Sequence, residues 1–453
     1  MAEATADVRA HEPDASTVRK AVMASAIGNA VEWYDYGVFT SGVITATVGT
    51  VFFPESDKTT ATLQSLGLLA IGFIVRPLGG FFFGPLGDKL GRQRVLALTI
   101  LLMSGSTFLV GVLPPYAVIG IAAPMLLLLL RLIQSFSTGG EYGGAATFIA
   151  EYAPTKRRGF FGSFLEFGTL GGFVLGNSLV LITASVLSPA AMNGWGWRIP
   201  FLLALPLGLI GLYLRARLED TPTFRALVES GKAADRAPLK ETIFGNWRMI
   251  LNLIGIVILL NVADYLLLTT MPSYFTTTLH VSDTESALII IGVEIVQMAL
   301  IVPVGMLSDR IGRKPVLLTA AIGFIVLSWP SLWLMQQKTI VGLVLGFLVV
   351  AFLLVLILAV IASTFPAMFP TRVRYGSFAI GYNLSTSIFG GTTPIVVSAL
   401  VAGTGNAYWP AYYLIIAGVI GLVPILLIPE TKGVPMSEIN TAGSATRLAT
   451  GNT

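Results

Sequence analysis

The sequence of 453 residues contains no cysteine and only two histidines, His11 and His280. Without cysteine the chain can form no disulfide bond, no thiolate nucleophile and no cysteine-ligated metal site. Two histidines so far apart in the sequence also argue against a histidine-rich metal centre. We therefore expect no metal site, and the candidate functional residues must be sought among other side chains.

Charged residues are scarce as well. They make up 11% of the chain, whereas hydrophobic residues make up 54%. Soluble domains contain about 25% charged residues, so the composition predicts a multi-pass membrane protein. The phosphate-binding loop Gly-x4-Gly-Lys-Ser/Thr is absent from the sequence, which argues against transport driven by ATP. We predict neither an enzyme nor a bound cofactor.

Twelve apolar segments are long enough to cross a bilayer core of about 30 Å as helices. The sequence therefore predicts an all-α membrane protein with twelve transmembrane helices. We place these segments at residues 21–47, 62–86, 94–113, 118–149, 160–187, 197–217, 247–274, 286–307, 316–335, 340–365, 377–402 and 410–428.

Lysine and arginine gather on every second connection between these segments, for example at residues 89–94 and 310–314. Cytoplasmic loops of membrane proteins carry an excess of these residues, so this side is predicted to be cytoplasmic. The same side then carries the N-terminal tail 1–20, the central loop 218–246 and a short C-terminal tail 429–453.

The chain repeats itself. Residues 84–92, after the second segment, have the pattern Gly-x-x-x-Asp-x-x-Gly-Arg, and residues 305–313, after the eighth, have it again. Glycine permits a tight turn, and aspartate can cap a neighbouring helix. The repeat predicts two six-helix bundles at 21–217 and 247–428, with a latch at these loops. The predicted gating residues are Asp88, Arg92, Asp309 and Arg313.

The first apolar segment carries two acids, Glu32 and Asp35, which share one helix face with Asn29. An ionised carboxylate in hydrocarbon is costly, so these acids should face protein or water. They are candidates for coupling proton movement to transport. The alternative is that either acid only balances a neighbouring arginine.

Four further motifs narrow the assignment: 28–35 (Gly-Asn-x-Val-Glu-Trp-Tyr-Asp), 74–80 (Ile-Val-Arg-Pro-Leu-Gly-Gly), 139–144 (Gly-Gly-Glu-Tyr-Gly-Gly) and 195–201 (Trp-Gly-Trp-Arg-Ile-Pro-Phe). With them, residues 20–430 resemble the metabolite:proton symporter family of the major facilitator superfamily. Within that family, residues 151–160, 204–215, 271–274 and 363–371 resemble the proline/glycine betaine transporters. The resemblance implies proton-driven import by alternating access, in a bacterial cytoplasmic membrane. The implied cargo is a zwitterionic osmolyte such as proline or glycine betaine.

The fourth segment shows one polar face, which includes Arg131, Gln134, Glu141 and Tyr142. Arg131 could bind a substrate carboxylate, since a guanidinium suits two-point carboxylate recognition, or it could pair with Glu32 or Asp35. Glu141 lies among glycines that allow close helix packing. It is either a proton site, with Glu32 and Asp35, or an interhelical hydrogen-bonding residue. Arg76 is interpreted as structural.

Acids and aromatic rings in other segments could bind the cationic end of a cargo, the rings through cation–π contacts. The candidate substrate-binding residues are Asn29, Trp33, Tyr36, Arg131, Gln134, Tyr142, Glu166, Asp264, Tyr265, Glu294, Tyr382 and Asn383.

Three other functions remain open. The first is proton-driven import of an organic acid such as α-ketoglutarate, although the many intramembrane acids weigh against an anionic cargo. The second is a proton-antiport exporter, and the third is a sensor that binds solute without moving it. The expected partners are a small-molecule substrate, protons and the lipid bilayer. No nucleic acid and no obligate protein partner is expected.

Overall fold

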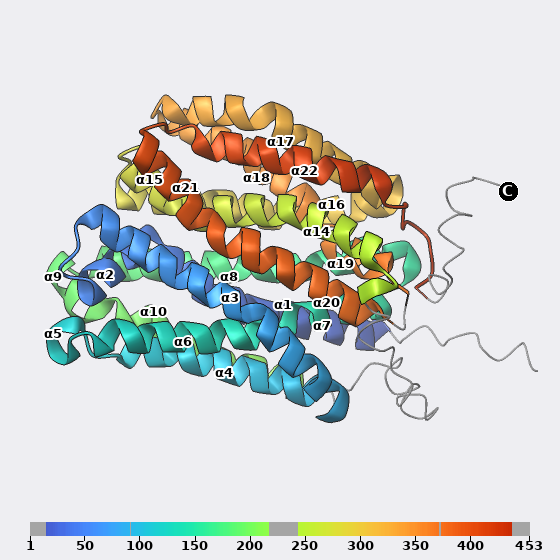
Figure 1. The fold of residues 1–453 in the computed structure, drawn as a ribbon, viewed down its shortest axis with the longest axis horizontal. Helices are drawn as coiled ribbons and strands as arrows, with labels where there is room; N and C mark the ends of the chain where they lie inside the picture. Colours follow the sequence, from blue (N-terminus) through green and yellow to red (C-terminus); the bar gives the residue numbers. More distant parts are fainter. Residues whose placement is uncertain (1–14, 91, 217–242, 371–372, 437–453) are drawn as a thin grey trace, which may run out of the picture.

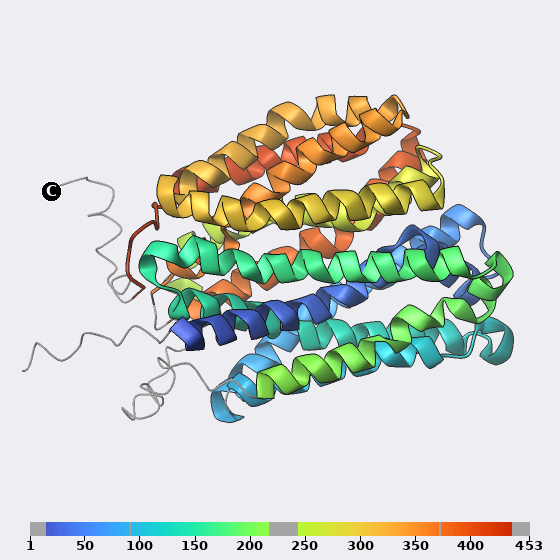
Figure 2. The same ribbon diagram turned by 180° about the vertical axis from the view of Figure 1, so that it is seen from behind.

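The computed structural model describes residues 15–90, 92–216, 243–370 and 373–436. Within these residues, nine helices are long and apolar enough to cross a membrane. Three shorter apolar helices lie at Gly42–Phe52, Ile71–Phe83 and Ala97–Val112. Each predicted segment coincides with one helix or with consecutive helices separated by a break. The helices run side by side as one elongated bundle (Figures 1 and 2). The predicted all-α fold with twelve transmembrane helices is confirmed.

The first half of the chain forms the lower layers of Figure 1, coloured blue to green. The short helices α5 (Tyr116–Ile119) and α9 (Pro189–Ala191) lie at connections. The main helices are α1 (Ala15–Thr40), α2 (Gly42–Phe52), α3 (Lys58–Leu90), α4 (Arg92–Val112), α6 (Ala122–Thr138), α7 (Glu141–Tyr152), α8 (Arg158–Val186), α10 (Arg198–Leu202) and α11 (Ala204–Ala216).

The second half forms the upper layers, coloured yellow to red. Two π-helical segments, η4 (Tyr265–Thr270) and η6 (Thr386–Gly390), interrupt its helices. The helices are α14 (Trp247–Asp264), α15 (Met271–Thr277), α16 (Asp283–Ile311), α17 (Arg313–Gln336), α18 (Ile340–Leu358), α19 (Ile361–Thr364), α20 (Arg374–Ser385), α21 (Gly391–Thr404) and α22 (Trp409–Leu427).

Helix breaks recur at matching places in the two halves. The first span breaks at Ser41, between α1 and α2, and the seventh span has η4 after α14. The fourth span breaks at 139–140, between α6 and α7, and the tenth at 359–360, between α18 and α19. Irregular backbone inside a membrane is tolerated where it is buried in protein or lines a cavity. The repeat therefore includes the interruptions as well as the helices.

Glycine allows helices of the first half to touch backbone to backbone. A Cβ at Gly79 in α3 would lie 1.8 Å from the carbonyl oxygen of Phe136 in α6. A Cβ at Gly139 would lie 1.9 Å from the carbonyl oxygen of Arg76. These distances are far shorter than any van der Waals contact. The α3–α6 crossing, which fixes the position of Arg76, thus depends on these two glycines.

Replacing Gly79 with alanine is expected to destabilise the protein by about 3 kcal/mol or more, because two backbones must separate to admit the methyl group. The melting temperature of the detergent-solubilised protein would measure the loss. Gly105→Ala in α4 is the matched control, since no atom lies within 4 Å of a Cβ there. That variant should be as stable as the parent. Equal stability of both variants would contradict the described crossing.

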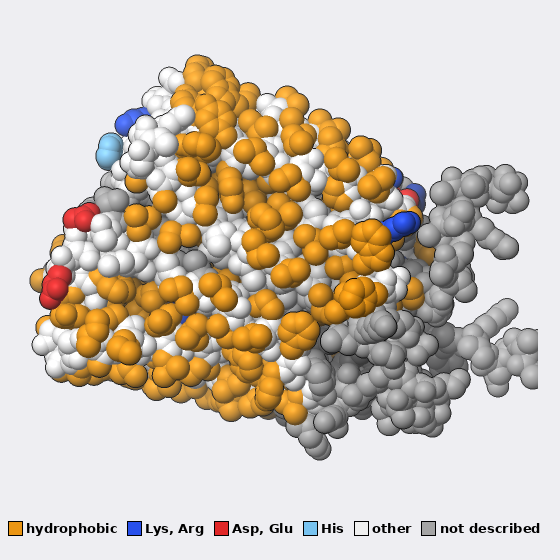
Figure 3. Space-filling model, in the orientation of Figure 1, with side chains coloured by type: hydrophobic (Ala, Val, Ile, Leu, Met, Phe, Trp, Pro, Cys, Tyr) orange, Lys and Arg blue, Asp and Glu red, His pale blue; other side chains and the backbone are white. Residues whose placement is uncertain are grey.

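The two halves meet along α8 and α16, and α3 packs against α20, η6 and α21. On the outside, large hydrophobic side chains such as Ile74, Leu129 and Val326 are exposed. Figure 3 shows hydrophobic side chains across the middle of one face, with most visible charged side chains at its two ends. This distribution suits a protein whose middle is surrounded by lipid.

Candidate functional site

Arg76 of α3 lies where the two halves meet. Its guanidinium lies 3.4 Å from the Glu32 carboxylate of α1 and donates a hydrogen bond of 3.4 Å to the Tyr265 hydroxyl of η4. The side chains of Arg76 and Glu32 are both 1% exposed. Arg76 therefore connects the first half to the second. The sequence analysis gave it only a structural role, although its apolar surroundings were a signal of function.

Asp35 belongs to a network inside the first half. Its carboxylate forms an ion pair of 2.6 Å with Arg131 and accepts a hydrogen bond of 3.2 Å from Gln134. Gln134 accepts a hydrogen bond from Arg131 and donates another to Thr107. The Arg131 guanidinium also lies 3.6 Å from the centre of the Phe39 ring. The structure thus pairs Arg131 with Asp35 and leaves Arg131 two buried N–H groups without a described partner.

Glu166 of α8 accepts hydrogen bonds from Tyr142, at 2.5 Å, and from Thr169, at 2.8 Å. The Thr169 hydroxyl in turn accepts a bond of 2.6 Å from Asn29. The Tyr142 ring stacks on Tyr382 of the second half, with ring centres 4.4 Å apart. In the part of the chain that the structure describes, no lysine or arginine forms an ion pair with Glu166.

Asp264 ends α14 beside this cluster. It is buried, and its Oδ1 has no hydrogen-bond partner among the described residues. It interacts electrostatically with Glu166 and Arg76. Asn261, one turn earlier, likewise has a buried Nδ2 without a described partner. Buried polar atoms are normally hydrogen-bonded, so these two atoms mark a place where a polar ligand could bind.

Aromatic rings from both halves gather around Tyr265, the residue that follows Asp264. Trp33 lies 5.0 Å from Tyr36, 5.5 Å from Phe173 and 6.1 Å from Tyr265, measured between ring centres. Phe73 lies edge-on to Tyr265 at 5.1 Å. The buried Trp33 indole N–H has no described partner. The rings and the unpartnered acid are side chains of the kinds that can bind a compact cation.

The fourth and eleventh spans meet at the helix break between α6 and α7. Asn383 of α20 donates a hydrogen bond of 2.9 Å to the Gly139 carbonyl oxygen. This oxygen belongs to the last turn before the break, where carbonyl groups lose their helical partners. Glu141 is buried in the first turn of α7. The structure thus places Asn383 in a contact between the two halves. Its partner Gly139 lies two residues before Glu141.

Glu294 of α16 lies apart from these groups and faces α8. Asn177 of α8 donates to both of its carboxylate oxygens, at 3.0 and 3.3 Å. Gln297, one turn on, donates to the Ala351 carbonyl oxygen. The sequence analysis grouped Glu294 with the substrate-binding residues, whereas the structure gives it a contact of its own between the halves.

The latch predicted after the eighth span closes one end of the bundle, which we call the latch end. Asp309 of α16 accepts hydrogen bonds from the backbone N–H groups of Gly159, at 2.8 Å, and Phe160, at 2.9 Å. Its carboxylate also pairs with Arg313 at 2.7 Å. Asp309 therefore caps α8 of the other half, as the sequence suggested. The backbones of Asp88 and Arg92 lie in α3 and α4, and their side chains lie outside the described residues.

Two further contacts lie at the latch end, the first between the two halves and the second within the second half. Arg374 of α20 pairs with Glu151 of α7 at 3.3 Å. Glu430, after α22, accepts hydrogen bonds from the backbone N–H groups of Arg313 and Lys314, both at 3.0 Å. The sequence analysis gave Glu430 no role.

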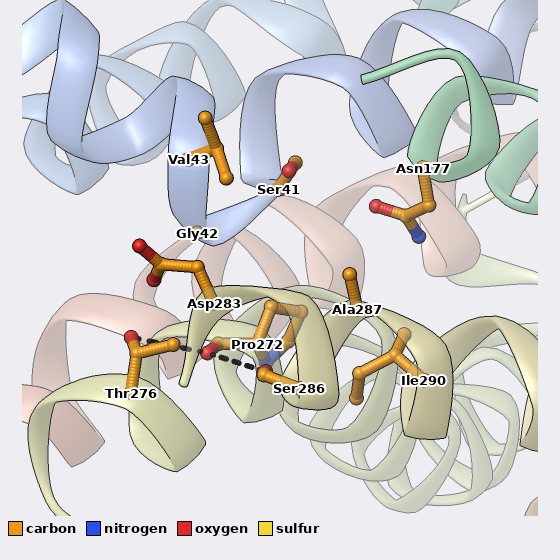
Figure 4. A pocket seen from close by; sticks show the side chains of 10 residues that line it. All are labelled: Ser41, Gly42, Val43, Asn177, Pro272, Thr276, Asp283, Ser286, Ala287 and Ile290. Atoms are coloured by element: carbon orange, nitrogen blue, oxygen red, sulfur yellow. Dashed lines mark hydrogen bonds between the residues drawn. The ribbon is translucent and has the colours of Figure 1, made fainter. Parts of the chain in front are cut away.

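A pocket lies at the opposite end, which we call the far end. Its lining comes from both halves, as Figure 4 shows: Ser41 and Gly42 face Asp283 and Ser286 across it. The rest of the lining consists of Val43, Asn177, Pro272, Thr276, Ala287 and Ile290. In the described residues, no group of three or more histidine, cysteine, aspartate or glutamate side chains could hold a metal ion.

Three comparisons with known proteins bear on this geometry. The family model described as "Sugar (and other) transporter" matches residues 20–242 and 232–442. The chain is 46% identical to the glycine betaine/proline/ectoine/pipecolic acid transporter OusA of Dickeya dadantii, over 95% of this chain and 87% of that protein. It is 44% identical to the proline/betaine transporter of Escherichia coli strain K12, with the same coverage.

Solved structures share the fold. The major facilitator superfamily proton:xylose symporter XylE bound to 6-bromo-6-deoxy-D-glucose matches with a TM-score of 0.75 at 19% identity, covering 94% of this chain and 98% of that one. The inward-open form of XylE from E. coli matches with a TM-score of 0.67 at 19% identity, covering 93% and 99%. The chain therefore belongs to the sugar (and other) transporter family, as a multi-pass membrane protein with the major facilitator fold.

Proposed function

We propose that this protein imports a zwitterionic osmolyte, proline or glycine betaine, together with protons. The names of its relatives support this cargo, and so does the chemistry where the halves meet. The observation that carries the proposal is the buried, unpartnered carboxylate oxygen of Asp264, next in sequence to Tyr265 and the aromatic rings of both halves around it. A solute with one positive and one negative end would match the region where the halves meet, because this region contains both Asp264 and Arg76.

The positive end of the cargo would bind at Asp264. An ammonium group gains a charge-assisted contact there, and a quaternary ammonium group gains cation–π contacts with Trp33 and Tyr265. Glu166 adds negative charge nearby, and its hydrogen bonds to Tyr142 and Thr169 hold it in place. Glu166 belongs to the first half and Asp264 to the second. A cation bound between these two acids would therefore draw the halves together and favour an occluded state.

The negative end would bind at an arginine. Arg76 is the better placed of the two candidates, because it already reaches Tyr265 of the second half, whereas the described contacts of Arg131 lie within the first. The separation of 3.4 Å between Arg76 and Glu32 is long for a charge-assisted hydrogen bond. A cargo carboxylate could therefore replace Glu32 as the partner of Arg76.

Asp35, Glu32 and Glu141 remain the proposed coupling acids of the first half. A proton on Asp35 would remove the negative charge that balances Arg131, so the network with Gln134 would have to rearrange. Burying an unbalanced charge is costly, which links the protonation of Asp35 to a change in conformation.

Alternating access would follow from rocking of two bundles, 21–217 and 247–428, about this centre. The contacts of Asp309 with α8 and of Arg374 with Glu151 join the two halves at the latch end and would keep it closed. With the basic loops as a guide, we propose that the latch end and both termini face the cytoplasm and the far end faces outward.

Solute-driven proton entry tests the function. The purified protein would be placed in liposomes that contain a pH-sensitive dye, and proline, glycine betaine and α-ketoglutarate would be added in turn. Acidification with proline or glycine betaine supports the proposal. Acidification with α-ketoglutarate alone would replace the cargo by an organic acid, which the two ion-paired arginines make less favourable. No acidification with any solute, from folded protein, would reject proton-coupled import.

Asp264→Asn should raise the solute concentration needed for half-maximal uptake by about tenfold or more, because a charge-assisted contact contributes about 1.5–3 kcal/mol. Radiolabelled uptake across a range of solute concentrations would measure the change. Glu285→Gln, which removes an exposed acid at the start of α16, is the control and should leave the value unchanged. An unaltered half-maximal concentration for Asp264→Asn would remove this acid from the binding site.

A further inference from the structure

The hydrogen bond between Asn177 and Glu294 crosses the boundary between the two halves. Asn177 lies on α8 and Glu294 on α16, the two helices that run along each other at this boundary. Glu294 is 0% exposed and Asn177 is 5% exposed. Any separation of the halves at the far end must break this contact and bring water to Glu294.

Glu294 has no cationic partner in the part of the chain that the structure describes. Its described polar contact is the amide of Asn177. Glu32 and Asp35 differ in this respect, because each pairs with an arginine. Glu294 is thus a buried acid without a compensating charge.

The titratable groups on α16 and on the surrounding elements lie toward the ends of the bundle or bind other residues, and one of them, Asp283 of α16, lines the far-end pocket. The elements packed against α16 are η1 (Thr155–Arg157), α2, α8, α15, α17 and α18. The charges of η1 are Lys156 and Arg157, which directly precede α8 at the latch end, and the sequences of α2 and α18 contain no titratable residue. On α8, Glu166 lies about 16 Å along the helix from Asn177 and binds Tyr142, while Arg158 lies at the latch end. On α15, Tyr274 donates to Ala407. On α17 the charges are those of Arg313 and Lys314, at the latch end, and on α16 itself they are Asp283, Glu285, Asp309 and Arg310, at its two ends.

A buried carboxylate without a counter-charge is strongly disfavoured, whereas the protonated carboxyl is neutral. A protonated carboxyl also donates a hydrogen bond and needs an acceptor. Gln297, one turn on along the same helix face, is 2% exposed and has a buried Oε1 without a described partner. An acceptor for the proton of Glu294 therefore lies on its own helix.

The far-end pocket leads toward Glu294. Asn177 lines this pocket and also donates to Glu294. Ile290 lines it too, and it precedes Glu294 by one helical turn, or about 6 Å. In Figure 4, Asn177 and Ile290 lie on the same side of the pocket, at the right of the view. Water that enters the pocket thus comes within about one turn of the acid.

We propose that Glu294 is a proton-binding residue of the transport cycle, loaded from the far side through this pocket, and that its protonation allows the halves to close there. The inference rests on the proposed proton-coupled import. A proton from far-side water binds a carboxylate oxygen of Glu294, and the neutral side chain is then buried against Asn177. The same proton returns to water when the latch end opens.

Thiol labelling at the far end tests the proposal without any solute. The chain has no cysteine, so Ser286→Cys supplies a single thiol in the pocket. A membrane-impermeant maleimide, applied from the far side, should react faster as the pH rises from about 6 to about 8, approaching tenfold per unit for one proton. The rate is divided by that of a Ser188→Cys protein, which has an exposed thiol at the same end. The division removes the effect of pH on the reaction between thiol and maleimide itself.

Glu294→Gln, added to Ser286→Cys, should make the divided rate independent of pH to within about twofold, because glutamine imitates the protonated acid and keeps an oxygen for Asn177. Asn177→Asp should move the pH dependence upward by about one unit or more, since two adjacent carboxylates resist losing the last proton. A Glu294→Gln protein with the pH dependence of its parent would overturn the proposal. An unshifted profile for Asn177→Asp would do the same, even if the glutamine variant failed to fold.

The labelling experiment and the transport assay test the role of Glu294 and the proposed cargo independently of each other. A parent protein that shows the pH-dependent labelling but moves neither proline nor glycine betaine would reject the proposed cargo and keep Glu294 as a proton-binding residue. A parent protein that imports these solutes with protons, but labels equally at every pH, would keep the function and reject the role of Glu294.

Discussion

Replacing Asp35 with asparagine is expected to abolish accumulation of solute driven by a pH gradient, while exchange of labelled for unlabelled solute continues in part. Asparagine can still accept a hydrogen bond from Gln134, but it can neither carry nor release a proton. Proteoliposomes with an imposed pH gradient would measure accumulation, and counterflow in the absence of a gradient would measure exchange. Normal accumulation by this variant would remove Asp35 from the coupling role.

The same substitution leaves Arg131 buried without its counter-charge, at a cost of about 3–5 kcal/mol of folding stability. The double variant Asp35→Asn, Arg131→Gln removes both charges and should recover most of that stability without recovering accumulation. Melting temperatures of the two variants separate the two effects. A double variant that accumulates solute would mean that the Asp35–Arg131 pair stabilises the fold and does not couple protons.

Asp309→Ala should open the latch end. The substitution removes two hydrogen bonds to the N-terminus of α8 and the ion pair with Arg313. Hydrogen bonds to a charged group contribute about 1.5–3 kcal/mol each, so the population with an open latch end should rise by about 100-fold. Ser308 is fully buried against Gly159 in the closed form. A cysteine placed there by Ser308→Cys should react with a thiol reagent at least tenfold faster when Asp309→Ala is also present.

Glu55→Gln is the control for this prediction, since it removes an exposed acid at the far end and should leave the labelling of Ser308→Cys unchanged. Asp309→Asn should fall between the parent and the alanine variant, because one amide oxygen can still accept a backbone N–H. If the alanine variant labelled as slowly as its parent, the cap on α8 would not be what holds the latch end closed.

Much of the fold follows from local sequence. An apolar run of spanning length can be satisfied in a bilayer only as a helix, so the segments at 247–274 and 340–365 could be placed without any neighbours. The repeated Gly-x-x-x-Asp-x-x-Gly-Arg pattern predicted a helix-capping and gating role for Asp309, because a capping acid and a turn glycine act over a few residues, and the structure shows the cap. Helix breaks were not predicted: the interruption at Gly139 depends on Arg76 and Asn383, which lie far away in sequence.

Partners across the bundle could not be read from the sequence. The spacing of Glu32 and Asp35 places both acids on one helix face, but it cannot say that one pairs with Arg76 and the other with Arg131. Helical periodicity fixes the face of a residue within its own helix only. The contacts of Glu294 with Asn177 and of Glu430 with Arg313 likewise join residues more than a hundred positions apart.

The sequence by itself determined that this protein is a twelve-helix transporter built from two similar halves, because hydropathy, loop charge and repeated motifs are properties of short stretches. The tertiary structure alone decided which buried acids have a cationic partner and which do not. Glu32 and Asp35 form ion pairs with arginines, whereas Asp264 and Glu294 form no ion pair among the described residues. That difference depends on the distance between charges on separate helices, and it sets whether an acid can hold a cargo cation or a proton.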